Sequence, residues 1–274
     1  MLANVQRYTR DYQQDVLTFI QTQRRVQQHL DWRPIRDWLH DDDAYIFLSV
    51  TGQGLRGLLA FSKPVGGTTW LRLIGIHNQA GIEIFRELLQ VAHSHLDEVN
   101  VRNILVLDMQ PWLAPILGIN GFERIHHLVH LRRPAGHIDS KPSIKIVQAN
   151  YRHIPLVVPI DHAAFDGAWQ MDTSDFTSAM SYASHFTMAV LDQRLVGYQL
   201  STSYADGIHL ARLAVLPEMM RQHIGSQLVV ELINKFPRKS ITVNTQSTNE
   251  AAQLLYERLG FKKEDMITPI WRLQ

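Results

Sequence analysis

The sequence predicts an α/β protein built from two copies of one domain, each an α+β arrangement with a mixed, mostly antiparallel sheet flanked by helices. The main observation is a repeat, because three landmarks recur in one order at a separation of about 140 residues. They pair Gly57 with Gly197, Ile74–Ile76 with Leu213–Val215, and Asn120–Phe122 with Leu259–Phe261. Two further observations are a break at mid-chain and the order of strands and helices in the second copy.

The break at mid-chain runs from Arg132 to Ser143. It has two prolines, a glycine and no sustained apolar period, which predicts a linker. The expected domains are therefore residues 1–134 and residues 143–274. Arg132 and Arg133 form the clearest basic stretch in a chain of formal net charge +1, and we expect them to be solvated between the domains. No nucleic-acid partner is expected.

Hydrophobic periodicity predicts the elements of the second copy. In chain order they are a strand at 144–147, one or two helices within 151–183, a hairpin of strands at 187–191 and 195–203, a strand at 208–216 that Pro217 ends, a helix at about 224–236, a strand at 241–245, a helix that opens at the capping-box spacing of Ser247–Glu250 and ends at Gly260, and a closing strand at 267–273. The helix at 224–236 has an apolar residue at every fourth position, which predicts one buried stripe.

Composition narrows the function classes. Hydrophobic residues make up 45% of the 274 positions, enough for a core in each half, and no segment has the length of a membrane helix. The absence of cysteine excludes disulfides, thiolate nucleophiles and cysteine-ligated metals. We therefore expect a cytoplasmic protein with no membrane partner, either a monomer or a homodimer.

The histidines do not predict a metal site. The groups His93/His95 and His126/His127/His130 lack a neighbouring carboxylate at ligand spacing, so no metal cofactor is expected. Residues 41–43 are three aspartates, which are more typical of a solvated helix end than of a cation site.

Residues 213–228 contain a strand, a short loop and the start of a helix. The first backbone amides of a helix have no partner inside the helix, and the helix dipole adds positive potential there. A phosphate group can bind these amides where the loop backbone comes close. The segment therefore predicts an anion site.

This segment resembles the coenzyme A signature of the GNAT superfamily of N-acetyltransferases, a strand ending in V-x-P followed by [Q/R]-x-x-G-x-[G/A]. Residues 249–261 resemble the second hallmark of the family, N-x-x-A-x-x-L-Y-x-x-x-G-F, at every position. The first signature departs from the pattern at two places, with Met220 at the Gln/Arg position and His223 at the first glycine. Arg221, one place along, can supply the positive charge that Met220 lacks.

The resemblance implies a role for each matching residue. The backbone of Leu213, Ala214 and Val215 would bind the pantetheine arm of acetyl-CoA like an added strand. The pyrophosphate would lie on the amides of Arg221, Gln222, His223, Ile224, Gly225 and Ser226. Asn249, Ala252 and Tyr256 would contact the coenzyme, and Tyr256 would protonate the leaving thiolate as general acid. The alternative for Tyr256 is a core aromatic.

The general base is less clear from the sequence, because the strand at 208–213 has no carboxylate. His209 is a candidate base, since an imidazole titrates near neutral pH, and the alternative is a hydrogen-bonded sheet histidine. Asp206, Asn244 or water alone are other options.

The first copy keeps the scaffold and lacks the site. It has no V-x-P turn, and Gly81 comes about five residues too early for the repeat offset. Its last helix, at 112–117, contains Pro115 and no tyrosine at the position of Tyr256. We expect this degenerate copy to do no chemistry and to help shape the acceptor pocket.

The sequence thus predicts a tandem GNAT protein that transfers an acyl group, acetyl first of all, from acyl-CoA to an amine of a small molecule or of a peptide. The acceptor is expected beside residues 161–175, where acidic and aromatic residues alternate and would suit a cationic amine. The alternative function is a catalytically inactive GNAT-fold protein that binds acyl-CoA or serves as a scaffold.

Overall fold

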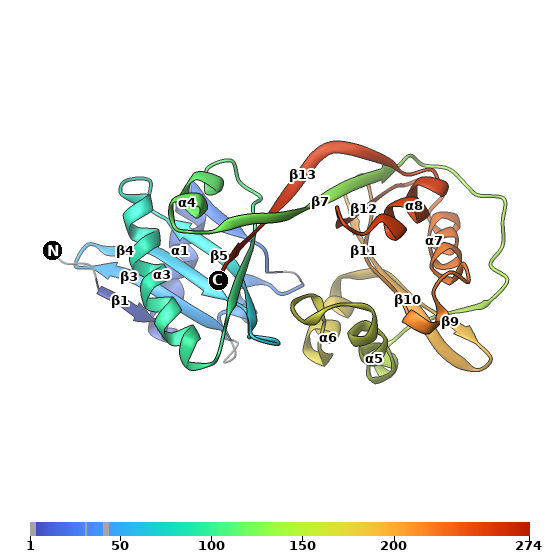
Figure 1. The fold of residues 1–274 in the computed structure, drawn as a ribbon, viewed down its shortest axis with the longest axis horizontal. Helices are drawn as coiled ribbons and strands as arrows, with labels where there is room; N and C mark the ends of the chain where they lie inside the picture. Colours follow the sequence, from blue (N-terminus) through green and yellow to red (C-terminus); the bar gives the residue numbers. More distant parts are fainter. Residues whose placement is uncertain (1–3, 31, 41–43) are drawn as a thin grey trace. The chain divides into compact units, whose positions relative to one another are not determined.

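The computed structural model describes residues 4–30, 32–40 and 44–274, so the aspartates at 41–43 lie outside the described residues. The chain forms two compact units. Unit 1 comprises residues 1–125 and 268–274, and unit 2 comprises residues 126–267. Each unit contains a mixed, mostly antiparallel sheet flanked by helices, as the sequence predicts (Figure 1).

The sheet of unit 1 has the strand order β1-β3-β4-β5-β6-β13, with β2 beside part of β5. Its strands are β1 (Asn4–Arg7), β2 (Arg25–Gln28), β3 (Tyr45–Thr51), β4 (Gly54–Phe61), β5 (Thr68–Ile76), β6 (Asn103–Leu107) and the end of β13 (Lys262–Leu273). All of these pairs are antiparallel except β5 with β6.

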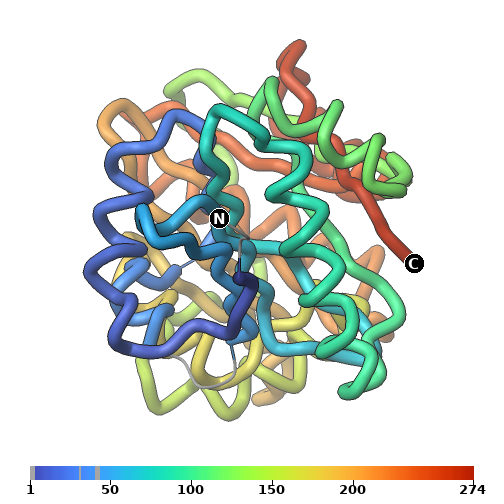
Figure 2. Tube along the Cα trace, turned by 90° about the vertical axis from the view of Figure 1, so that its left-hand side faces the viewer, coloured from blue at the N-terminus to red at the C-terminus, as the bar shows by residue number. Residues whose placement is uncertain are grey.

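The helices of unit 1 lie on the two faces of this sheet (Figure 2). They are α1 (Gln13–Thr22), α2 (Ile35–Trp38), α3 (Gly81–Glu98) and α4 (Leu113–Ile119). Because strand side chains alternate between faces, Leu58 and Ala60 of β4 pack with α1 and α2, whereas Leu59 and Phe61 pack with α3 and α4. Both faces are therefore covered by apolar cores.

The sheet of unit 2 has the strand order β7-β12-β11-β10-β9-β8. The strands are β7 (Glu123–Arg133), β8 (Lys145–Gln148), β9 (Ala183–Leu191), β10 (Arg194–Tyr204), β11 (Gly207–Val215) and β12 (Ser240–Gln246). Only β11 and β12 pair in parallel.

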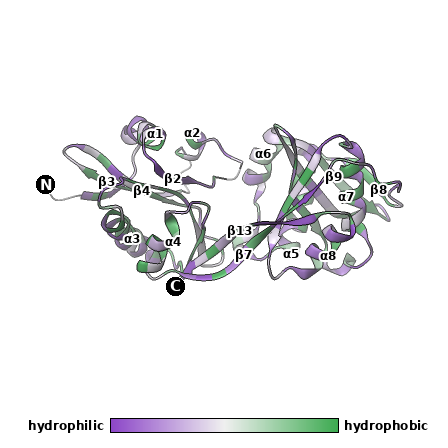
Figure 3. Cartoon of the chain, turned by 90° about the horizontal axis from the view of Figure 1, so that it is seen from above, coloured by the Kyte–Doolittle hydropathy of each residue, from purple (hydrophilic) through white to green (hydrophobic). Residues whose placement is uncertain are grey.

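The helices of unit 2 also cover two faces. On one face lie α5 (Ile154–Ala164) and α6 (Thr173–Tyr182), where Phe176 packs against Phe186 and Tyr198. On the other lie α7 (Ile224–Lys235) and α8 (Glu250–Arg258), over a core that includes Leu232 and Val243. The hydropathy colouring shows hydrophobic and hydrophilic residues on each of these helices (Figure 3).

The two sheets exchange their last strands. Strand β7 follows the last helix of unit 1 but pairs with β12 of unit 2 through residues 128–133. Strand β13 follows α8 of unit 2, and its residues 270–273 pair with β6 of unit 1 (Figure 1). The compact units therefore differ at their ends from the expected domains 1–134 and 143–274, because residues 126–134 belong with unit 2 and residues 268–274 with unit 1.

The linker prediction was wrong for Arg132 and Arg133. Both lie in β7, opposite Thr242 and Ile241 of β12, and irregular structure begins after them. The predicted capping box at Ser247–Glu250 starts two residues too early, because the N-cap of α8 is Asn249. Its side-chain oxygen accepts a hydrogen bond from the amide of Ala252.

In the described part of the chain, no helix has both the length and the apolar character needed to cross a membrane.

Candidate active site

The edge of β11 that faces β12 is open over its second half. The two strands pair in parallel only from Gly207 with Ser240 to Leu210 with Val243. Strand β11 then continues to Val215 with β10 on its other side, whereas β12 continues beside β7. Because Leu216 donates its amide to Val196 of β10, the alternation of the backbone directs the amides and carbonyls of Leu213 and Val215 toward the open edge.

A β-bulge at Ala211 marks the start of this open edge. Leu210 pairs with Ser201 and Arg212 pairs with Leu200, so Ala211 has no residue opposite it on β10. The bulge places His209 and Arg212 on the same face of the sheet, the face covered in part by α5 and α6. Close approach of β10 requires glycine nearby, since a Cβ atom at Gly197 would lie 2.7 Å from the carbonyl oxygen of Ala214.

The loop after β11 leads directly to the start of α7. Arg221 and His223 both take the left-handed backbone conformation, with φ of 61°. His223 therefore occupies a position that favours glycine, as its alignment with the first glycine of the signature predicts. No side chain caps the start of α7, and its first turn contains no acidic residue. Its first amides are thus available to an anion in a turn geometry that suits one.

Helix α8 packs beside the start of α7. A Cβ atom at Gly225 would lie 3.2 Å from Cδ1 of Leu255, so a larger residue there would push against α8. Asn249 begins α8, and its side-chain oxygen is engaged by the amide of Ala252, 3.1 Å away. Ala252 is half-buried against the core beneath α7.

Tyr256 lies on α8 with its ring buried in the same core and 5.5 Å from the ring of Phe261. Burial raises the pKa of its phenol above the ordinary value, so the group is protonated at neutral pH. Among the described residues, no hydrogen bond to the Tyr256 hydroxyl is found. The ring is therefore a core aromatic, and its hydroxyl proton is available to a ligand.

His209 belongs to a polar cluster on the face of the sheet opposite α7 and α8. The cluster consists of His130 and Arg132 of β7, His209 of β11, Thr242 and Asn244 of β12, and Glu264 of β13. Nδ1 of His209 lies 3.0 Å from Oγ1 of Thr242, and Asn244 lies two residues further along β12 on the same face. Burial is the main cause that lowers the pKa of His209, so the imidazole is neutral at pH 7.

Four members of this polar cluster, His130, Arg132, Thr242 and Glu264, were missed as catalytic candidates. Cross-strand pairing sets His130 opposite Asn244 and Arg132 opposite Thr242. The Nε of Arg132 lies 2.6 Å from a carboxylate oxygen of Glu264. The sequence contains a pattern that indicates a strand here, because His130 and Arg132 alternate with the apolar Val129 and Leu131. The strand at 123–133 was nevertheless not predicted. The other proposed base, Asp206, is exposed in the turn before β11.

The acidic group expected to bind an amine is already paired. Asp161 of α5 is fully buried and forms an ion pair with Arg212, 2.6 Å from Nε. The same carboxylate accepts hydrogen bonds from the Tyr198 hydroxyl and the Met171 amide. The expectation of a cationic amine beside Asp161 was therefore wrong for this residue, because Arg212 balances its charge.

The corresponding edge in unit 1 is filled by the chain itself. Strand β5 pairs with β6 only through residues 68–70, and β2 then occupies the edge of β5 at residues 73–76. The buried Gln27 of β2 donates to the carbonyl of Leu107 at 2.7 Å and accepts from the amide of Met109 at 2.9 Å. The loop of unit 1 between β5 and α3 is shorter than the loop between β11 and α7 of unit 2. Ala80 takes the left-handed conformation directly before Gly81.

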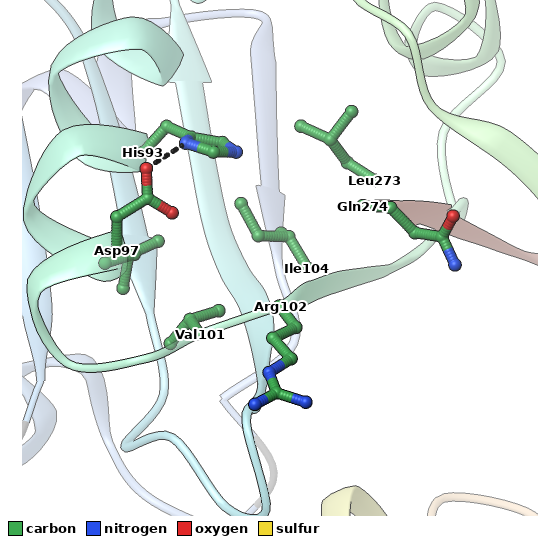
Figure 4. A pocket seen from close by; sticks show the side chains of 8 residues that line it. His93, Asp97, Val101, Arg102, Ile104, Leu273 and Gln274 are labelled. Carbon is green, nitrogen blue, oxygen red and sulfur yellow. Dashed lines mark hydrogen bonds and ion pairs between the residues drawn. The ribbon is translucent and has the colours of Figure 1, made fainter.

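A small pocket of unit 1 lies elsewhere, at the end of α3 (Figure 4). It is lined by His93, Asp97, Arg102 and apolar side chains of α3, β6 and β13. Contrary to expectation, His93 does have a carboxylate partner, since its Nδ1 lies 3.0 Å from Asp97. Within the described residues, no group of three His, Asp or Glu side chains is arranged to hold a metal ion.

Comparison with known proteins agrees with this geometry. Residues 155–261 match the acetyltransferase (GNAT) family. Unit 2 contains a GNAT-family domain. The match covers the open edge of β11, the loop, α7 and α8, which carry the two sequence signatures. No curated protein sequence matches the chain significantly.

The solved structures extend the GNAT fold over both units. A tandem GNAT protein from the clavulanic acid biosynthesis pathway is 14% identical, with a TM-score of 0.64 over 99% of this chain and 98% of that one. A GCN5-related N-acetyltransferase from Sphaerobacter thermophilus is 12% identical, with a TM-score of 0.64 over 99% and 95%. One from Anabaena variabilis is 11% identical, with a TM-score of 0.69 over 99% and 72%. The chain therefore has a tandem GNAT fold.

Proposed function

We propose that unit 2 transfers an acyl group, acetyl first of all, from acyl-CoA to an amine by direct attack on the thioester. The observation that carries the proposal is the open edge of β11, which the loop at 216–223 connects to the uncapped start of α7. An extended pantetheine arm would add to this edge through Leu213 and Val215. Its pyrophosphate would lie on the amides of residues 221–226.

The chemistry requires a base for the amine and an acid for the leaving thiolate. His209 lies on β11 two residues before the bulge at Ala211, and its neutral imidazole can accept a proton from the ammonium that forms when the amine attacks the thioester. Tyr256 can donate its hydroxyl proton to the leaving sulfur, because burial keeps the phenol protonated. An amide at the bulge would stabilise the oxyanion, since strand separation leaves that edge unpaired.

The acceptor would lie over the polar cluster. With Asp161 paired to Arg212 and Arg132 paired to Glu264, this face offers hydrogen bonds rather than an uncompensated charge. A neutral amine with polar substituents fits these groups better than a polycation.

Calorimetric titration with acetyl-CoA and with coenzyme A tests the proposal. We expect one site per chain, because β2 fills the corresponding edge of unit 1. Ser226→Glu should weaken binding roughly tenfold, since its carboxylate repels the pyrophosphate although it suits the helix dipole. Ser174→Glu, the same change in the first turn of α6, serves as the control. Two equal sites, or no binding at millimolar coenzyme, would contradict the proposal.

Release of the coenzyme thiol in the presence of tyramine, spermidine, glucosamine or a lysine peptide distinguishes an enzyme from the inactive alternative. An enzyme should accept at least one amine and lose turnover in Tyr256→Phe while it still binds coenzyme. Coenzyme binding without thiol release for any of these amines would support the non-catalytic function.

A further inference from the structure

The polar cluster contains a second histidine whose position the catalytic roles above leave unused. We propose that His130 receives the proton that His209 removes from the ammonium and passes it to solvent. This inference rests on the proposed function of unit 2.

Strand register brings the two histidines to one face of the sheet. His209 lies opposite Thr242 on β12, and His130 lies opposite Asn244, two residues further along the same strand. Residues 242 and 244 point to the same face because side chains alternate along a strand. Asn244, the cross-strand partner of His130, therefore shares this face with His209 and His130.

The hydrogen bonds of Thr242 indicate the tautomer of His209. Its hydroxyl lies 3.5 Å from the carbonyl oxygen of Ile208 and 3.0 Å from Nδ1 of His209. If the hydroxyl donates to the carbonyl, Nδ1 carries its hydrogen toward Thr242 and Nε2 holds the lone pair. The lone pair of Nε2 is then available to accept a proton.

The charges around the two histidines favour one shared proton. Burial lowers the pKa of both rings, and the charge of His130 lowers that of His209 further. Glu264 acts in the opposite direction and raises the pKa of His130. Arg132 is paired with Glu264 at 2.6 Å and donates to the Tyr204 hydroxyl at 3.2 Å.

The proposed proton path is balanced. The ammonium formed by attack of the amine on the thioester loses one proton to Nε2 of His209. That proton moves to the His130 ring, whose pKa the Glu264 carboxylate raises, and then to solvent. His209 returns to its neutral form, and Tyr256 recovers from solvent the proton that it gives to the thiolate, so the whole transfer releases no net proton.

Titration of the histidine rings by NMR tests the coupling without any acceptor. In His130→Gln, we expect the pKa of His209 to rise by roughly half a unit, because a neighbouring positive charge is lost. In Glu264→Gln, the pKa of His130 should fall. His127→Gln is the control, since His127 lies on β7 at a position that alternates onto the opposite face. Unchanged titrations of both rings would overturn the proposal.

The second test measures the rate of acyl transfer to an amine. If no amine is accepted, the rate of acetyl-CoA hydrolysis is measured instead. His130→Ala should reduce the rate roughly tenfold and should be rescued by added imidazole. A purely structural role would give no rescue. Failure of the proposed function is recognised separately, because the wild-type protein would then bind no coenzyme or release no thiol, whereas a wrong proton path leaves wild-type binding and turnover intact.

Discussion

The side chain of Gln27 accepts a hydrogen bond from the backbone amide of Met109, at 2.9 Å, and so fixes β2 to the residue that follows β6 by two positions. With the bond it donates to Leu107, this glutamine holds β2 in the separation between β5 and β6. The arrangement explains why a GNAT fold is kept in unit 1 without an open edge for a coenzyme.

Gln27→Ala should lower the free energy of unfolding by about 2 to 4 kcal/mol, because two buried backbone groups lose their partner. Urea unfolding measures the change. Gln28→Ala, at the exposed neighbouring position, should have an effect within about 0.5 kcal/mol. An equal effect of both substitutions would show that Gln27 does not hold the strand.

His223→Gly should stabilise the protein by about 1 kcal/mol, because glycine adopts a φ of 61° without the strain that a Cβ atom introduces. Coenzyme affinity should be retained or increased. His223→Val should destabilise, since a β-branched residue is strained at positive φ. Thermal unfolding with calorimetry checks both variants, and a less stable glycine variant would mean that the imidazole makes a compensating contact.

Tyr256→Phe should reduce kcat roughly 100-fold while the dissociation constant of coenzyme changes less than about threefold. The ring and its contact with Phe261 are kept, so stability should also be nearly unchanged. Steady-state kinetics and calorimetry measure the two quantities. A variant with full kcat would assign Tyr256 to the core alone.

Asp161→Asn should destabilise unit 2 by about 3 to 5 kcal/mol, because it leaves the buried Arg212 without its counter-charge. The exposed Asp166→Asn is the matched control. Combining Asp161→Leu with Arg212→Met should recover much of the loss in urea unfolding. If the double variant is no better than Asp161→Asn, the charge imbalance is not the cause.

Stability should decrease as the pH falls below about 6.5, the ordinary pKa of histidine. His209 and His130 have lowered pKa values in the folded protein, so the unfolded chain binds protons first and is favoured by acid. Above pH 6.5 both rings are neutral in both states and the full stability is present. His209→Gln should flatten the dependence of unfolding free energy on pH between 5 and 7, and an unchanged slope would argue against a buried neutral ring.

Local sequence patterns were sufficient for most elements of unit 2. The apolar stripe of α7 and the Pro217 stop of β11 gave boundaries within a residue of those observed. The glycine-like position of His223 was also predictable, because a signature residue there must take a positive φ.

The polar cluster was not predictable in the same way. Its members come from β7, β11, β12 and β13, and only pairing between distant strands brings them together. The strand β7 was missed because its polar residues and the prolines that follow are typical of a linker. The filling of the unit 1 edge depends on β2, a four-residue strand too short for a periodic signal.

The exchange of last strands also bears on how the chain folds as it is synthesised. Strand β6 of unit 1 acquires its second neighbour only when residues 270–273 have left the ribosome, so until then one edge of its sheet is unpaired. Unit 1 would otherwise fold early as an independent domain, but its sheet is thus tied to the synthesis of residues 270–273. During that interval the unpaired edge is open to pairing with another nascent chain.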